Sequence, residues 1–282
     1  MTKRRPNRQP QQLEDSEWLR RLDRISDAVD AWRKRAENPV SAEPGSSLVA
    51  DSIEGLSVEN PVWYSMCISS EHLDFAIDAM RATSTMYPTA YMTVARTAFV
   101  AAVNAVWVLA PSTRQERRER ALRFRADDLR VQMTSFRDMQ IPEGKPEEAR
   151  TGLLKQLGER QASLQKVATA LGIKENVTKI RFDQTRAIDW VAQHMHGVDD
   201  DLLIGATQAV WRSGSAAAHA QYHFGVMRLD RNEVVREASD SSIVRLRGDL
   251  DNDVGPALAA ATMTLNEAFR IYDLRRVSHI RT

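Results

Sequence analysis

The chain has 282 residues and a formal net charge of +1 at pH 7, with 43% hydrophobic and 27% charged residues, proportions normal for a soluble globular protein. The near-zero charge excludes a global electrostatic attraction to nucleic acid or membrane, so any RNA contact has to come from local patches. The single cysteine, Cys67, excludes an intramolecular disulfide.

The first 12 residues are predicted to be a disordered tail with a short run of basic side chains, Lys3, Arg4, Arg5 and Arg8. No apolar segment follows them, so the sequence predicts no signal peptide. Together with the single cysteine, this favours a reducing, cytoplasmic location. Arg outnumbers Lys by 32 to 7, which we interpret as the mark of a GC-rich bacterial genome and, as the alternative, of Arg-rich binding.

An amphipathic helix is predicted over residues 13–37. Its apolar side chains recur three and four residues apart, at Trp18, Leu22, Ile25, Val29 and Trp32. We expect this stripe to dock on the chain's own bundle, and the alternative is an arm that binds a protein partner. Pro, Gly and Ser residues then indicate a linker over 38–59.

Residues 60–282 are predicted to form one helical bundle domain. Caps and breaks place helices at 60–86, 89–110, 113–139, 146–171 and 183–196, followed by a helix from Asp199 that carries Arg212 and His219. The helix at 89–110 is long and apolar, but Arg96 interrupts it, and a central Arg costs about 2.5–3.5 kcal/mol in a bilayer. We therefore expect a buried helix of a soluble bundle and no membrane partner.

Residues prone to form β-strands replace the helical pattern near 224–247, in short runs separated by polar turns. A small β-hairpin or ribbon is predicted there, and a last helix is predicted over 254–277. The expected fold class is mainly α, a helical bundle with one minor β element.

The segment from Trp211 to His219 places Arg212 and His219 two helical turns apart. Seven residues turn through about 700°, so both side chains project from nearly the same side. The intervening residues are Ser, Gly and Ala, on a face of small residues: Gly205, Ala209, Ser213, Ala216 and Ala220. Arg keeps its charge while His changes protonation near neutral pH, a combination that suits RNA strand cleavage and also ordinary packing.

The spacing of Arg212 and His219 resembles the Arg-x4–6-His signature of the HEPN superfamily, helical bundles that include RNA-cleaving toxins and phage-defence proteins. The resemblance implies metal-independent RNA cleavage with no cofactor, at a site formed when two protomers pair their motif helices. The ribose 2′-OH would be the nucleophile, with His219 handling a proton and Arg212 holding the phosphate. Ser213 stands where the family often has Asn, Asp or His, and the likeness covers one helix.

A second likeness extends over several short segments. His72-Leu73, Arg96, Trp107 to Pro111, Arg117 to Arg123 and Ser215 to His219 look like the core of uncharacterised actinobacterial all-helical proteins. This likeness implies the fold class and an actinobacterial source, and it implies no activity.

Four residues are predicted to support the Arg–His pair: Ser213, Ser215, His223 and Arg96. His223 lies four residues after His219, the spacing of two metal ligands on one helix, but no Glu or Cys completes a ligand set. No metal site is therefore predicted, and His223 is expected to support His219 or to cap a helix end.

Arg96 is the lone charge of the apolar helix at 89–110. A buried Arg has to be paired and hydrogen-bonded. It is expected to pair with a carboxylate of the preceding helix, Glu71, Asp74 or Asp78. The alternative is that it points into the same pocket as His219.

Four arginines fall along one face of the helix predicted over 113–139: Arg114, Arg117, Arg118 and Arg125. As a nucleic-acid-binding track for RNA phosphates, they would give binding a steep salt dependence. The alternative is a solvated face whose cations pair with acidic residues of the same helix.

Two functions remain open from the sequence. The first is a HEPN-like endoribonuclease of the toxin or phage-defence type, which acts on RNA as a homodimer. The alternative is a non-catalytic helical protein that binds a protein partner in a phage-related or regulatory complex.

Overall fold

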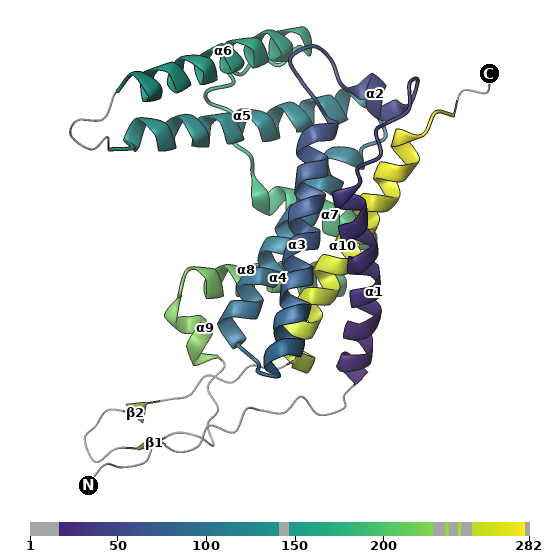
Figure 1. Ribbon diagram of the computed structural model, residues 1–282, viewed down its shortest axis with the longest axis vertical. Coiled ribbons are helices and arrows are strands. Elements are labelled where there is room, and N and C mark those ends of the chain that lie inside the picture. The colour runs from purple at the N-terminus through teal and green to yellow at the C-terminus, as the bar shows by residue number, and fades with distance from the viewer. Residues whose placement is uncertain (1–16, 141–146, 228–234, 237–241, 244–249, 280–282) are drawn as a thin grey trace. The chain divides into compact units, whose positions relative to one another are not determined.

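The computed structural model describes residues 17–140, 147–227, 235–236, 242–243 and 250–279 (Figure 1). Its helices are α1 (Glu17–Glu37), α2 (Ser47–Asp51), α3 (Glu59–Thr83), α4 (Pro88–Leu109), α5 (Arg114–Asp138), α6 (Glu148–Ala170), α7 (Gln184–His196), α8 (Asp201–Ala218), α9 (Tyr222–Val226) and α10 (Gly255–Arg276). A π-helical turn over Leu250–Val254 leads into α10. The mainly α fold class is therefore confirmed, while the predicted tail at 1–12 lies outside the described residues.

Helix ends follow the capping residues of the sequence. The Thr113 hydroxyl accepts a hydrogen bond from the Glu116 N–H and begins α5, and the Asp200 carboxylate accepts one from the Leu203 N–H and begins α8. Gly172 follows α6 in the left-handed region, with φ of 76°, as a glycine does after many helices.

The β element predicted near 224–247 is not supported at that extent. Phe224 lies in α9 rather than in a strand. The described residues give only two paired dipeptides, β1 (Val235–Arg236) and β2 (Ser242–Ile243), which run antiparallel. The remaining residues of the predicted ribbon lie outside the described ranges.

The described chain divides into two compact units rather than the single bundle domain predicted for 60–282. Unit 1 takes its residues from 1–40, 66–103 and 192–267, and unit 2 takes its residues from 41–65, 104–191 and 268–282. The predicted linker at 38–59 is structured in part, because it contains α2 with Leu48 and Asp51 fully buried.

In unit 1, α1 buries four of the five side chains of the apolar stripe that the sequence predicts. Leu22, Ile25, Val29 and Trp32 are all buried. The Arg81 guanidinium of α3 donates to Ser26 at 2.8 Å and to Asp23 at 3.0 Å, which ties α1 to the unit. These four side chains are covered within unit 1, as docking on the chain's own fold predicts, while the side chain of Trp18 lies outside the described part of the chain. Binding of a protein partner through residues 13–37 stays a prediction.

In unit 2, α5 and α6 lie side by side (Figure 1).

The buried Arg120 of unit 2 packs against two indole rings. The Arg120 guanidinium lies 5.0 Å from the ring centroid of Trp107 and 3.7 Å from that of Trp190. It also donates to the Trp107 carbonyl at 2.8 Å and to Glu116 at 2.6 Å. Burial lowers the pKa of Arg120, and the hydrogen bond to Glu116 opposes this.

Helix α4 is the one helix of the described residues that is long and apolar enough to cross a membrane. In its most apolar stretch 61% of the residues are buried inside the protein. The core helix of a folded protein passes the same test of length and composition as a membrane span.

Candidate functional site

Helix α8 packs closely on α4 at Gly214 in unit 1. A Cβ atom on Gly214 would lie 2.5 Å from the Arg96 Cβ and 3.0 Å from the Met92 carbonyl oxygen. Only glycine permits an approach this close. Ala216 and Ala217 are also buried. Several small residues between Trp211 and His219 therefore pack inside the protein.

Arg212 and His219 both have exposed side chains. Arg212 lies two residues before Gly214, about 200° around the helix, and therefore faces away from α4. Among the described residues, neither side chain has a hydrogen-bond or ion-pair partner. A helical rise of about 1.5 Å per residue separates the two positions by about 10 Å along the axis, with both side chains open to solvent.

The chain turns sharply directly after His219, which is the C-cap of α8. The N–H groups of Ala220 and Gln221 donate to the carbonyls of Ala217 and Ala216 at 3.2 and 2.9 Å, a Schellman arrangement. Ala220 has φ of 50°, a left-handed conformation that is costly for a residue with a Cβ atom. The position of His219 at the helix end is therefore fixed by a strained turn.

His223 belongs to α9, beyond this turn, and is exposed. It does not share a helix with His219, so the spacing of two ligands on one helix is not realised. Within the described ranges, no group of three or more His, Cys, Asp or Glu side chains is placed to hold a metal ion.

The predicted face of small residues divides into two parts. Gly205 and Ala209 are exposed on α8, whereas Ala216 is buried. Ser213 and Ser215 are half-buried. The exposed part of this face therefore lies toward the N-terminal half of α8, on the side that also carries Arg212.

Arg96 does not form the predicted ion pair. Its aliphatic carbons cover Gly214, and its Nε atom is buried without a hydrogen-bond partner in the described part of the chain. Asp74 instead lies 3.8 Å from the Arg33 guanidinium. Burial raises the pKa of Asp74, Arg33 opposes the rise, and Asp78 adds to it.

The predicted arginine track is interrupted at Arg117, which is buried and binds the buried Asp51 carboxylate, whereas Arg114 is exposed and Arg118 is half-buried. Its Nη2 atom donates to Asp51 at 2.8 Å, and its Nη1 atom donates to the Pro111 and Ser112 carbonyls. Arg114 approaches the same carboxylate at 3.4 Å, and Arg118 donates to two backbone carbonyls of α2. These arginines hold α2 against α5.

Arg125, the fourth member of the predicted track, lines a cavity in unit 2 together with Arg160, Tyr64 and Phe124. Sequence reasoning did not single out Arg160, Tyr64 or Phe124. They come from α6, α3 and α5, and no spacing rule relates residues on three helices. The sequence signal for this site was weak: Arg160 has no acidic residue three or four positions away on its helix. The same pattern is typical of an ordinary solvated helix face.

Comparison of the chain with protein-family models, with curated proteins and with solved structures finds no match. The HEPN-like and actinobacterial resemblances therefore stay predictions that depend on the residues named above.

Proposed function

We propose that the protein is a metal-independent endoribonuclease of HEPN-like type, whose site is the exposed side of α8 with Arg212 and His219. The observation that carries this proposal is that both side chains are exposed and unpartnered among the described residues, on the side of α8 opposite its packing against α4. A polyanion can reach such a side without any rearrangement of the unit.

The chemistry requires one base, one acid and one cation. The neutral imidazole of His219 accepts the proton of a ribose 2′-OH, and the 2′ oxygen attacks the adjacent phosphorus. The 5′ oxygen of the next nucleotide leaves and takes a proton from an imidazolium, which leaves a 2′,3′-cyclic phosphate. Arg212 stabilises the negative charge that develops on the phosphoryl oxygens.

A second copy of the chain would supply the acid, since one α8 carries one such His. The exposed side of α8 carries the small residues Gly205 and Ala209, which would permit close approach of a second α8 helix. This supports the pairing of two α8 helices. Leu202 adds an apolar contact at one end of this side, with 82% of its surface exposed. A symmetric dimer then joins two Arg212–His219 pairs in one site.

The test is cleavage of RNA by the purified full chain in the presence of EDTA. We expect cleavage by the native protein and at least a hundredfold slower cleavage by Arg212→Ala and by His219→Ala, because each removes a group that acts in the transition state. Arg186→Ala is the matched control for a lost surface cation, because the Arg186 side chain is 88% exposed and lies on α7.

Absence of cleavage by a folded native protein, or full activity of both site variants, contradicts the proposal. The first result would favour the second function, binding of a protein partner. Exposed apolar side chains near α8 and α9 support that alternative: Val198, Leu202, Tyr222 and Met227.

A further inference from the structure

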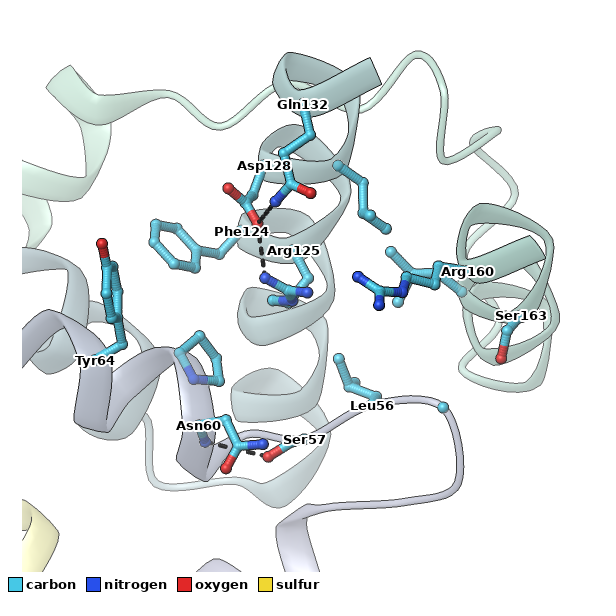
Figure 2. Close-up of a pocket in the computed structure, with 14 residues that line it drawn as sticks. Leu56, Ser57, Asn60, Tyr64, Phe124, Arg125, Asp128, Gln132, Arg160 and Ser163 are labelled. Atoms are coloured by element: carbon cyan, nitrogen blue, oxygen red, sulfur yellow. Dashed lines mark hydrogen bonds and ion pairs between the residues drawn. The ribbon is translucent and has the colours of Figure 1, made fainter. Parts of the chain in front are cut away.

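A cavity of about 620 Å³ lies within unit 2, between α5, α6 and the segment that runs from Gly55 to Tyr64 (Figure 2). This volume is in the range of about 300–1,000 Å³ that small-molecule sites occupy. Apolar atoms form most of the lining surface, and Leu56, Leu129 and Leu164 contribute to it. Size and lining are therefore those of a site for one small organic molecule.

The segment that borders the cavity approaches α6 closely at Gly55. Gly55 has φ of 82°, and a Cβ atom there would lie 2.8 Å from the Ser163 hydroxyl oxygen. A side chain at this position would be strained by the positive φ and would displace the Ser163 hydroxyl. The close approach at Gly55 therefore helps to shape the cavity within unit 2.

Two guanidinium groups, from Arg125 on α5 and Arg160 on α6, are directed into the same space (Figure 2). Asp128 accepts a hydrogen bond from Arg125 at 2.6 Å and one from the Gln132 amide at 3.0 Å. Arg160 has no carboxylate partner in the described part of the chain. The cavity therefore holds two cations against one carboxylate, and its positive charge selects an anion.

Aromatic and amide side chains lie on the side of the cavity away from Arg160. Tyr64 and Phe124 both lie on this side (Figure 2), and Tyr64 has 66% of its surface exposed. Such rings stack on flat heteroaromatic groups. The Asn60 amide and the Gln132 amide oxygen offer polar groups to the edge of a ring.

We propose that this cavity binds a nucleoside monophosphate. Arg125 and Arg160 hold the phosphate, because two guanidinium forks match its oxygens and its charge of about −2. Tyr64 and Phe124 stack on the base, and the apolar wall covers it. This site does not depend on the proposed function, which uses residues of unit 1.

The test is isothermal titration of the full chain with AMP, GMP, CMP and UMP, each separately, and with adenosine and inorganic phosphate. We expect at least one mononucleotide to bind at least tenfold more tightly than adenosine and than phosphate. Adenosine can use the rings without the arginines, and phosphate can use the arginines without the rings. Arg160→Ala should weaken the mononucleotide at least tenfold and leave adenosine unchanged, while Arg160→Lys should lie between.

Lys166→Ala is the control for the loss of one exposed cation on α6, because Lys166 does not line the cavity. His219→Ala should bind the mononucleotide as the native protein does, which separates this site from the RNA-cleaving one. The proposal is overturned if no mononucleotide binds more tightly than phosphate or adenosine. It is equally overturned if a folded Arg160→Ala protein binds the mononucleotide with native affinity.

Discussion

Ala220 is the residue next to the candidate site whose backbone is most constrained, with φ of 50°. This conformation destabilises a residue with a Cβ atom by roughly 1–2 kcal/mol and does not destabilise glycine. The substitution Ala220→Gly should therefore raise the free energy of unfolding by about 1 kcal/mol, after the larger chain entropy of glycine is subtracted. Urea denaturation of both proteins measures the difference.

Ala218→Gly is the control, two residues earlier and inside the last turn of α8. There the backbone is helical, so glycine should lower the free energy of unfolding by about 0.5–1 kcal/mol. Opposite signs at 220 and 218 support the left-handed turn. A loss of stability at Ala220→Gly would contradict it.

At the level of single side chains, the sequence could predict a shared helix but not a tertiary contact. The sequence predicts Arg212 and His219 as a pair on one helix, and both are exposed, with His219 at the C-cap. It also predicts an arginine track, but Arg117 is buried against Asp51, 66 positions earlier in the chain. Charge and spacing within a helix cannot reveal such a partner, because the contact depends on tertiary packing.

Helix α8 depends on Gly214 for its contact with α4. The substitution Gly214→Ala should lower the free energy of unfolding by about 1–3 kcal/mol, because the new Cβ atom would lie 2.5 Å from the Arg96 Cβ. Thermal unfolding followed by circular dichroism measures this change.

Gly205→Ala is the matched control on the same helix, because a Cβ atom at Gly205 meets no other atom within 4 Å. Alanine should there stabilise the helix, by up to about 1 kcal/mol. If both variants had the same effect, the close packing of α8 on α4 would be refuted.

The short helix α2 depends on the buried Asp51 carboxylate, which pairs with the buried Arg117 and with the exposed Arg114. The Arg275 guanidinium lies close to this network. Burial lowers the pKa of Arg275, the positive charge of Arg117 lowers it further, and the negative charge of Asp51 raises it. Loss of the Asp51 charge would leave the buried Arg117 guanidinium without its carboxylate partner. We expect Asp51→Asn to cost about 3–5 kcal/mol in the free energy of unfolding, measured by urea denaturation.

Asp138→Asn, at the exposed end of α5, is the control and should change stability by less than about 0.5 kcal/mol. Equal stability of Asp51→Asn and the native protein would show that the network does not hold α2.

The long helices could be predicted from the sequence because periodicity and caps are local signals. The predicted helix at 183–196 agrees with α7, and that at 89–110 agrees with α4 to within one residue. The helices α2 and α9 were missed, since five residues carry no periodic pattern. Their formation depends on contacts made elsewhere, as the burial of Asp51 and Phe224 illustrates.

At the scale of the whole molecule, the described chain forms two units that are discontinuous in sequence. Four helices, α3, α4, α7 and α10, contribute residues to both units, so no linker composition marks the division. This explains why composition and breaks along the chain predicted one bundle domain. The two proposed sites, on α8 and in the cavity beside α6, belong to different units.

For the protein as a whole, we propose that the exposed side of α8 cleaves RNA through the ribose 2′-OH. The most direct measurement incubates the full chain, in EDTA, with an RNA oligonucleotide and with its fully 2′-O-methylated copy, and analyses the products by mass spectrometry. We predict 2′,3′-cyclic phosphate ends from the unmodified RNA alone, and none when His219→Ala replaces the native protein. Intact RNA with a folded native protein, or equal cleavage of both oligonucleotides, would contradict the claim.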